Sequence, residues 1–517
     1  MNLTYDPWIP VRRADGSRET IAPWQITEGI AINPIIAVAS PRPDFDGALT
    51  QFLIGLLQTT CAPPDVFTWR KWRREAPTPD ELRGRFAAVA HAFDLEGKMA
   101  FMQDYSPAEL TNELEIAALL VDAPGENTLE QNKDHFIKRN GVARLCPACV
   151  ATALFGLQTN APSGGKGYRT GLRGGGPLTT LVLGKTLWET CWLNILDTAH
   201  YLGGEGGKDG EADRFPWLAP TRISEAKPPA GITTPVDVHP DQQFWAMPRR
   251  IRLLAEDLPA QALCDLCGTA STKVYRHFVT HNYGVNYQGF EHPLSPHYVK
   301  EARPNPIHPQ PGGIGYRHWL GVIENSADGT RRPAKVVERF RAQSQEDGRL
   351  WAFGFDMDNM KARCWYDATM PLLTVPEGMD SIFKALVEHL IQGADWVADV
   401  LRGRVKDALL GGADARGDLS FVQAHFWAVT EVTFYEHAER LRAGLSVPQA
   451  EVPVIESWRT VLRTAALSLF DHYVQAGDFD AVDPRRLATA RNDLAKALAS
   501  KKLRELLGLP QPTRNAA

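Results

Sequence analysis

Two Cys-x-x-Cys pairs, Cys146/Cys149 and Cys264/Cys267, constrain the fold of this chain more than any other feature. A two-residue gap lets both thiolates of a pair face one tetrahedral ion, and the glycine after the second pair suits a tight turn. Because the pairs are far apart in the sequence, one ion would tie distant segments together. A redox role would need a thioredoxin-like βαβ context, which the sequence does not show. We therefore predict one structural four-thiolate site with zinc as the default ion, although an iron–sulfur cluster uses the same ligands.

The length and composition are those of a multidomain globular protein. At 517 residues the chain is too long for one compact core, and 44% hydrophobic with 23% charged residues is ordinary for a globular protein. The start lacks the basic and apolar regions of a secretory signal, and no stretch approaches the roughly 18 apolar residues of a membrane span. We therefore expect a cytoplasmic protein with no membrane partner, whose seven cysteines do not form a disulfide framework.

The formal net charge of −5 restricts how this chain can bind nucleic acid. A protein that binds nucleic acid alone usually has a broad basic surface that contacts phosphates. We therefore expect any nucleic-acid contact to use local patches, or to be shared with more basic partners.

Two patterns follow each other along the sequence, and together they predict an α+β protein. Residues 1–372 are irregular, with Pro and Gly punctuation; 178–183 and 350–355 are short, β-rich and bounded by turn formers, and 47–59 has a helical pattern. We predict that this part is a large mixed α+β domain that contains the zinc site. Residues 373–517 form a second, helical domain.

The second domain has the periodicity of amphipathic helices. Apolar residues recur at spacings of four and three along one face of a long helix: Phe383, Val387, Leu390, Ala394, Val397 and Leu401. Two more helices are expected near 419–442 and 456–475. A fourth begins at Asp483-Pro484, an N-cap followed by proline at the first helical position, and continues to Leu507. Four such helices joined by short loops predict an antiparallel four-helix bundle.

A glycine-rich run from Ala161 to Pro177 follows the first cysteine pair. Glycine has no Cβ, so its backbone can approach a ligand closely, and Lys166, Arg169 and Arg173 between the glycines favour a polyanion. The run lacks the Gly-Lys-Ser/Thr ending of a Walker A loop, and no strand–helix context makes it a dinucleotide-binding fingerprint. The alternative interpretation is a flexible surface loop.

Two further segments have the composition of contact loops. Residues 132–139, Asn-Lys-Asp-His-Phe-Ile-Lys-Arg, alternate basic and aromatic character, which suits phosphates and an unpaired base, although a solvated loop fits equally well. Residues 354–366 have turn formers between two apolar runs and predict a hairpin with Asp358, Asn359 and Met360 at its tip. The later Gly and Glu of a calcium loop are absent, so the tip suits wedging into a partner better than binding an ion.

Little in the sequence indicates catalysis. His277 and His281 would place two imidazoles on one face of a helix, but no acidic residue lies where a zinc protease needs it. No nucleophile elbow and no paired-carboxylate arrangement is apparent. A metal-dependent hydrolase or nuclease using these two histidines and a remote acid is the alternative to a non-catalytic binding protein.

Several segments, in the same order, are similar to one protein family. Residues 2–11 (Asn-Leu-Thr-Tyr-Asp-Pro-Trp-Ile-Pro-Val), the 132–139 segment, Gly171-Leu-Arg-Gly-Gly, the 354–366 hairpin and the C-terminal helices resemble the large subunit (CasA) of the type I-E CRISPR surveillance complex, Cascade. The similarity covers essentially the whole chain. It implies a non-enzymatic role in antiviral defence: recognition of the protospacer-adjacent motif in double-stranded DNA from the minor groove, and the start of strand separation for an R-loop.

The resemblance also assigns residues to each nucleic acid. The glycine run matches the family's groove-reading loop, the hairpin tip matches its wedge, and His281 or Asn282 aligns with its groove-inserted lysine. The DNA contacts implied in this way are Ser163, Gly164, Gly165, Lys166, Gly167, Arg173, His281, Asn282, Asn359, Met360 and Lys361. The segment similar to the loop that docks near the 5′ end of the guide RNA supplies Asn132, Lys133, His135, Phe136, Lys138 and Arg139.

The same resemblance implies the partners. The helical domain resembles the part that contacts the small subunits and helps hold the displaced strand, within a complex that also contains backbone and guide-end subunits. The large subunit also recruits the helicase-nuclease. The cysteine pairs flank the glycine run and precede residues 273–298, so one ion could brace the DNA-reading loops against each other. A purely architectural subunit remains the third hypothesis.

Overall fold

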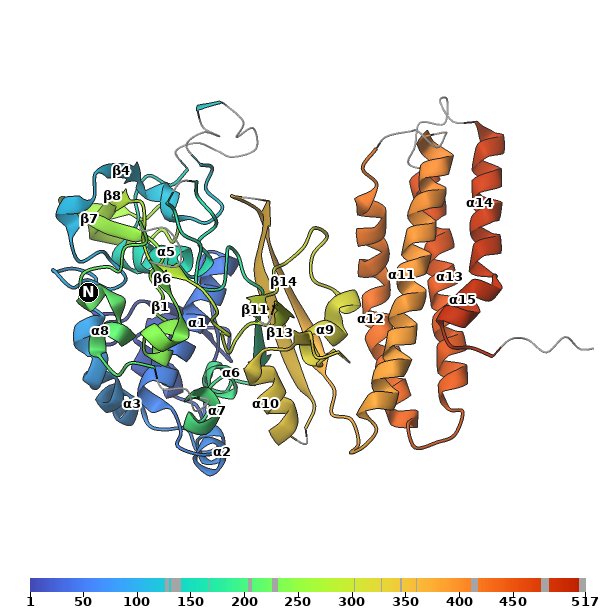
Figure 1. Cartoon of the computed structure of the whole chain (residues 1–517), viewed down its shortest axis with the longest axis horizontal. Coiled ribbons are helices and arrows are strands. Elements are labelled where there is room, and N and C mark those ends of the chain that lie inside the picture. Colours follow the sequence, from blue (N-terminus) through green and yellow to red (C-terminus); the bar gives the residue numbers. More distant parts are fainter. Residues whose placement is uncertain are drawn as a thin grey trace, which may run out of the picture. The chain divides into compact units, whose positions relative to one another are not determined.

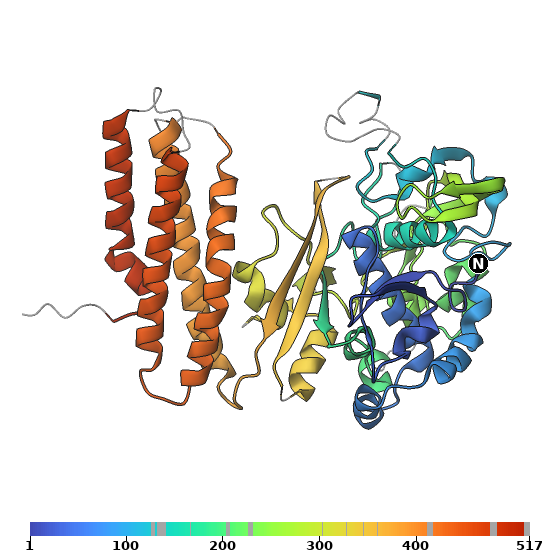
Figure 2. The same cartoon turned by 180° about the vertical axis from the view of Figure 1, so that it is seen from behind.

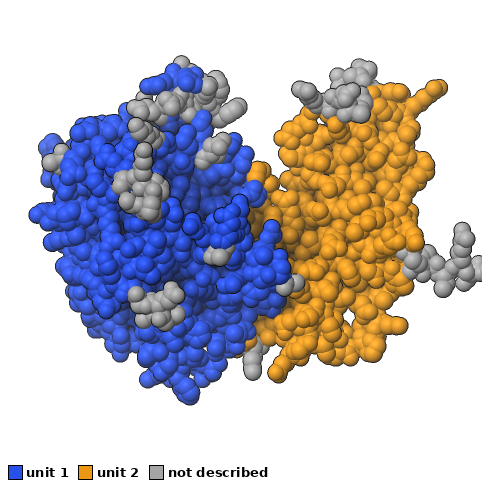
Figure 3. Space-filling view, in the orientation of Figure 1, with its two compact units in different colours: residues 1–310, 324–343, 349–369 blue, residues 311–323, 344–348, 370–517 orange. Residues whose placement is uncertain are grey.

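The computed structural model describes residues 1–125, 130–131, 141–165, 167–202, 207–225, 231–301, 303–326, 328–344, 346–358, 360–410, 417–475 and 483–510. The chain divides into two compact units, which Figure 3 colours separately. Unit 1 comprises Met1–Gln310, Glu324–Gln343 and Arg349–Thr369. Unit 2 comprises Pro311–Ile323, Ser344–Gly348 and Met370–Ala517.

Unit 1 mixes short helices with small sheets (Figure 1), so the predicted α+β class is confirmed. Its α-helices are α1 (Pro43–Cys61), α2 (Val66–Arg74), α3 (Pro79–Phe86), α5 (Pro147–Asn160), α6 (Leu187–Leu193), α7 (Thr198–Leu202), α8 (Glu211–Arg214) and α10 (Lys335–Gln343). Its 3₁₀ turns are Pro23–Thr27, Ala87–Ala92, Pro107–Glu109, Ile116–Leu119, Pro216–Leu218, Pro235–Asp237 and Pro240–Gln243.

The strands form several small sheets rather than one large one. Four of the sheets have three strands and the orders β2-β1-β3, β11-β10-β12, β14-β13-β5 and β4-β8-β7, and a fifth is the parallel pair β6-β9. The strands are β1 (Ile9–Arg13), β2 (Arg18–Ile21), β3 (Ile35–Val38), β4 (Asn112–Glu115), β5 (Thr179–Leu183), β6 (Ile232–Thr233), β7 (Arg250–Leu263), β8 (Ala270–His281), β9 (Asn286–Tyr287), β10 (His297–Lys300), β11 (Arg303–Pro306), β12 (Arg331–Arg332), β13 (Gly348–Asp358) and β14 (Lys361–Leu372).

The core of unit 1 is built around α1, which is buried on nearly all sides. The ring of Phe52 makes edge-to-face contacts with Trp8, Phe93, Phe155 and Trp245, and the centroid distances run from 5.0 to 5.9 Å. Such contacts add to the stabilisation from burial alone. The sequence pattern predicted this helix correctly but placed its ends inside the observed bounds, because burial continues beyond the periodic segment.

Unit 2 contains long helices that lie side by side (Figures 1 and 2). They are α11 (Asp380–Leu410), α12 (Ser420–Gly444), α13 (Glu451–Gln475) and α14 (Pro484–Leu498), accompanied by α9 (Trp319–Ile323), α15 (Lys501–Leu506) and a 3₁₀ turn at Tyr316–His318. The predicted apolar face of α11 is buried at all six positions, Phe383 to Leu401. The indole of Trp458 on α13 donates a hydrogen bond of 3.0 Å to the carbonyl of Leu390, which ties this face to its neighbour.

The fourth predicted helix is interrupted. α14 begins after the Asp483 N-cap as expected, but it ends at Leu498, and the Ser500 side chain caps a separate α15. After the break, the chain packs closely against α11. A Cβ added to Gly393 of α11 would lie only 2.4 Å from Cδ2 of Leu507. In the described part of the chain, no helix combines the length and the apolar character that crossing a membrane requires.

Candidate metal centre and nucleic-acid interface

The four cysteines meet where a helix begins and a hairpin turns. Cys146 is the N-cap residue of α5 and Cys149 lies in its first turn, while Cys264 and Cys267 lie between β7 and β8. Their Sγ atoms all lie within 4.8 Å of one another, and those of Cys146 and Cys267 are 3.6 Å apart. A tetrahedral ion with metal–sulfur bonds of about 2.3 Å places its sulfur ligands about 3.8 Å apart. The arrangement therefore fits a single metal ion held by four sulfur atoms.

The turn that carries the second pair has the expected geometry. Gly268 adopts φ +71°, a conformation that favours glycine, and its N–H donates to the carbonyl of Cys264 over 2.9 Å. The N–H of Cys264 donates to the carbonyl of Thr269, also over 2.9 Å. The two bonds close the turn and aim both thiols of this pair toward the first pair.

Protein contacts hold the two pairs together independently of any metal. The carboxylate of Asp265 accepts hydrogen bonds from the N–H groups of Ala143 and Arg144, at 2.8 and 2.9 Å. Leu145 and Tyr275 exchange two backbone hydrogen bonds of 3.0 and 2.9 Å. The segment that leads into α5 is therefore attached to the β7–β8 hairpin at Asp265, between the second cysteine pair, and at Tyr275 in β8.

The thiols of the cluster shift one another's pKa values. Cys146, Cys149 and Cys264 are buried, and Cys267 is exposed. Hydrogen bonds from Cys146 and Cys149 lower the pKa of Cys264, whereas the hydrogen bond to Cys146 raises the pKa of Cys149. The cluster thus stabilises the thiolate of Cys264. A bound cation would displace the protons of the other thiols and stabilise them as thiolates.

The glycine run presents bare backbone at the surface of unit 1. Ser163, Gly164 and Gly165 are exposed. Gly165 has φ +84° with nothing within 4 Å of an added Cβ, so its conformation requires glycine. At Gly164 an added Cβ would lie 2.7 Å from Cβ of Tyr168, so packing also excludes a side chain there.

The loop contacts the end of β8. The N–H of Tyr283 donates a 2.7 Å hydrogen bond to the carbonyl of Gly167. A Cβ at Gly167, where φ is +82°, would lie only 2.8 Å from Cβ of Asn282. Two predicted DNA-contacting positions, Gly167 and Asn282, therefore lie together, and His281 is the last residue of β8 beside them. Tyr283 has φ +63°, which is rare for a bulky residue and marks local backbone strain.

The far end of the glycine run packs against the base of the β13–β14 hairpin. A Cβ at Gly176 would lie 2.6 Å from the carbonyl oxygen of Phe355, and one at Gly354 would lie 2.5 Å from that of Pro177. Neither position can carry a side chain without moving the backbone of the other segment. The glycines at these positions thus serve a close contact between loop and hairpin.

The hairpin predicted for 354–366 is present, with β13 and β14 as neighbours in one sheet. Met360 is 50% exposed at the turn, and Lys361 is exposed beside it. Below the tip, the buried carboxylate of Asp356 accepts two hydrogen bonds from the guanidinium of Arg363, at 2.7 and 3.1 Å. This bidentate pair links the two strands and stiffens the hairpin beneath its exposed end.

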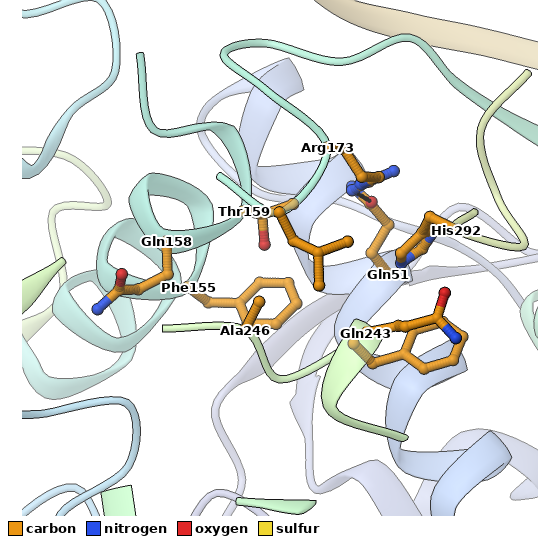
Figure 4. A pocket seen from close by; sticks show the side chains of 10 residues that line it. Gln51, Phe155, Gln158, Thr159, Arg173, Gln243, Ala246 and His292 are labelled. Atoms are coloured by element: carbon orange, nitrogen blue, oxygen red, sulfur yellow. Dashed lines mark hydrogen bonds between the residues drawn. The ribbon is translucent and has the colours of Figure 1, made fainter. Parts of the chain in front are cut away.

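The expectation that Arg173 contacts DNA is wrong for this structure. Arg173 is 3% exposed and donates hydrogen bonds to Thr179 Oγ1 at 2.9 Å, to Ser295 Oγ at 3.1 Å and to Gln51 Oε1. Burial lowers its pKa to about 9. It lines a cavity of about 20 Å³ with His292, which is room for roughly one water molecule and far too small for a nucleotide (Figure 4). Arg173 instead ties the glycine run to α1 and β5.

The sequence of residues 2–469 matches the family model described as CRISPR-associated protein Cse1. The chain belongs to this family. The resemblance to the large subunit of type I-E Cascade, CasA, is thereby confirmed. Cse1 is a non-catalytic subunit of a surveillance complex, so this chain is not an enzyme.

Solved Cse1 structures share the fold. Thermobifida fusca Cse1 is 16% identical with a TM-score of 0.73, and the match covers 99% of each chain. CasA from Thermus thermophilus is 18% identical with a TM-score of 0.66, covering 98% of this chain and 99% of that one. A chain of a CRISPR RNA-guided surveillance complex is 18% identical with a TM-score of 0.68, covering 97% and 99%.

The histidine arrangement considered for a hydrolase is absent from this Cse1 chain. His277 and His281 lie on strand β8, not on a helix as expected, because β8 pairs with both β4 and β7. Four residues along a strand separate the two positions by about 13 Å. Among the residues that the structure describes, the four cysteines are the only group of His, Cys, Asp or Glu side chains whose spacing could hold a metal ion. His277 and His281 therefore do not form the metal site that the hydrolase alternative requires.

Some predicted positions lie outside the described residues. They are Lys166, Asn359 and the implied guide-RNA contacts Asn132, Lys133, His135, Phe136, Lys138 and Arg139.

The sequence did not indicate which residues support the glycine loop of this Cse1 protein. Arg249 is buried; its guanidinium lies 4.9 Å from the ring centroid of Tyr168 and donates to the carbonyl of Pro162. Burial lowers the pKa of Arg249 to about 10. Arg169 turns away from solvent, donating to both Ser224 Oγ and the Ser224 carbonyl at 2.7 Å. No local pattern marks Arg249, because it precedes β7 and reaches the loop only in the folded chain.

Proposed function

We propose that this Cse1 chain recognises the protospacer-adjacent motif in double-stranded DNA from the minor groove and starts strand separation for R-loop formation. The observation that carries this proposal is the meeting of three distant segments in unit 1. Ser163, Gly164 and Gly165 are exposed, and Gly167 contacts the 281–283 segment; the far end of the same glycine run contacts the base of the hairpin.

The chemistry of these segments suits a minor groove. That groove is narrow, so a backbone without side chains can enter it. The hydrogen-bonding pattern of its base edges is degenerate, so a protein that reads it can tolerate several related motifs. The exposed Met360 is an apolar side chain at a stiffened hairpin tip, and apolar wedges unstack base steps from the minor-groove side. Lys361 beside it can neutralise a phosphate.

The remaining assignments follow from family membership. We propose that residues 1–372 dock to the 5′ end of the guide RNA through the 132–139 segment and hold a structural zinc ion at the four cysteines. We propose that residues 373–517 form an antiparallel four-helix bundle that contacts the small subunits and the displaced strand. Backbone and guide-end subunits and the helicase-nuclease are the other proposed partners.

The proposal is tested by measuring strand opening in the assembled complex. Target duplex carrying 2-aminopurine at the first base pair beside the motif reports unstacking as a rise in fluorescence. Met360→Ala should slow opening by about 10-fold or more, because unstacking a step costs a few kcal/mol. Asn359→Ala should have a similar effect.

Met99→Ala is the matched control, since Met99 is 45% exposed on the same unit. Opening that proceeds at the same rate in all three variants, with unchanged motif-dependent affinity, would favour the purely architectural subunit.

A further inference from the structure

Helix α2 carries a cationic face that the proposed motif-reading site does not use. Phe67, Arg70, Lys71 and Arg74 follow one another at spacings of three, one and three residues, so they share one face of the helix. All four are exposed, and Phe67 is 87% exposed. The ring of Phe67 therefore lies in solvent beside the three cationic side chains.

The opposite face of α2 is firmly anchored. Trp69 is buried, and its indole N–H lies 3.2 and 3.1 Å from the carbonyls of Trp192 and Ile195. The indole of Trp192 donates back to the carbonyl of Trp69 over 2.8 Å. The Trp72 ring packs 5.2 Å from that of Trp192. These contacts fix which side of the helix faces solvent.

The positive charges on the exposed face come from three side chains of α2, Arg70, Lys71 and Arg74. In the part of the chain that the structure describes, Arg70, Lys71 and Arg74 form no ion pair; Arg70 donates a hydrogen bond of 3.0 Å to the amide oxygen of Gln343. Asp65 at the N-terminus of α2 is occupied as a cap, accepting from the N–H of Thr68 over 2.7 Å. Although the net charge of the chain is −5, three cations on this face thus have no ionic partner among the described residues.

We propose that this face of α2 is a second nucleic-acid contact of the protein, and that it binds a single strand. Cations on one face track the phosphates, and an exposed ring offers a surface on which an unpaired base stacks without regard to sequence. In both views (Figures 1 and 2), α2 lies far from the exposed end of the β13–β14 hairpin, so this contact is separate from the hairpin tip.

The test measures binding of the purified full chain to a labelled oligothymidylate strand, which contains no motif, over a range of NaCl concentrations. Each phosphate contact contributes roughly 0.7 to the slope of log affinity against log salt, so Arg70→Ala/Lys71→Ala/Arg74→Ala should reduce the slope by about 2. Phe67→Ala should weaken binding by about 10-fold at an unchanged slope, and Phe67→Tyr should bind like the parent because its ring still stacks.

The control is Lys300→Ala/Arg331→Ala/Arg332→Ala, which removes three exposed charges from another surface of unit 1. This control variant should retain most of the slope of log affinity against log salt. Equal effects of the two triple variants would overturn the proposal, as would binding of polyglutamate or phosphatidylserine vesicles by this face without binding of the oligonucleotide. Motif-dependent duplex opening should be unchanged in the α2 variants, so failure of this inference is distinguishable from failure of the motif-reading proposal.

Discussion

Unit 1 and unit 2 differ in the regularity of the segments that their contacts join. In unit 2, the buried residues of each long helix repeat every three or four positions, so each regular helix presents an apolar face to helices that are near or far in the sequence. In unit 1, the site depends on contacts between segments far apart: Cys146 with Cys267, Asp265 with Ala143, and Arg173 with Gln51. Irregular loops can hold a defined shape only when such distant contacts support them. Disturbing these contacts should therefore affect unit 1 and spare unit 2.

The largest effect is expected from removing a metal ligand. Cys264→Ser should abolish metal binding and lower the free energy of unfolding of unit 1 by more than about 4 kcal/mol, because structural zinc sites contribute roughly 10 kcal/mol or more. Metal content by mass spectrometry and two-transition calorimetry measure both quantities. Cys364→Ser, at an exposed cysteine outside the cluster, is the matched control and should change neither. A metal-free Cys264→Ser protein of full stability would contradict the four-thiolate site.

The second-largest expected effect is that of acidification, which should lower the stability of unit 1 more than that of unit 2. Burial lowers the pKa of His239 and of His297 to about 4, and it lowers the pKa of His292 well below its usual value. These imidazoles stay neutral in folded unit 1, whereas in the unfolded chain they take up protons below about pH 6.5. As the pH falls from about 6.5 toward 4, the unfolded state binds more protons, so unit 1 loses roughly 1 kcal/mol per histidine per pH unit. Above about pH 6.5 this contribution is constant.

Calorimetry at a series of pH values, with metal content measured in parallel, tests this dependence. Release of metal at low pH would also destabilise unit 1, so only the range in which the metal stays bound is informative. His239→Gln should reduce the slope of unit 1 stability against pH. An identical slope for both units would contradict the assignment.

The smallest expected change in the free energy of unfolding is confined to unit 2. The Asp483 side chain accepts a 2.8 Å hydrogen bond from the N–H of Arg485 at the start of α14. Asp483→Ala should lower the free energy of unfolding of unit 2 by about 1 kcal/mol, while Asp483→Asn should retain most of it because asparagine also caps helices. Unit 1 should be unaffected. A loss in unit 1 as large as that in unit 2 would mean that the two units unfold together.

Prediction from sequence succeeded where the signal was periodic or where ligand chemistry required a fixed spacing. The apolar face of α11, the Asp483 cap, the hairpin at 354–366 and the cysteine set are examples. It failed for Arg173, because a basic residue among glycines looks the same in sequence whether it faces solvent or is buried. It also failed for His277, since four-residue spacing suggests a helix and only pairing with β4 and β7 makes the segment a strand.

The amino-acid sequence by itself therefore indicated which four cysteines cluster, the glycine positions, the order of helices in unit 2 and, through its similarity to Cse1, the family. These properties depend on residue type and on contacts within a few positions. Only the tertiary structure decided that Arg173 is buried, that Arg249 supports the loop, and that the cations on one exposed face of α2 have no ionic partner within the described ranges. Burial and partner choice depend on segments that meet only when the chain has folded, and no local pattern records them.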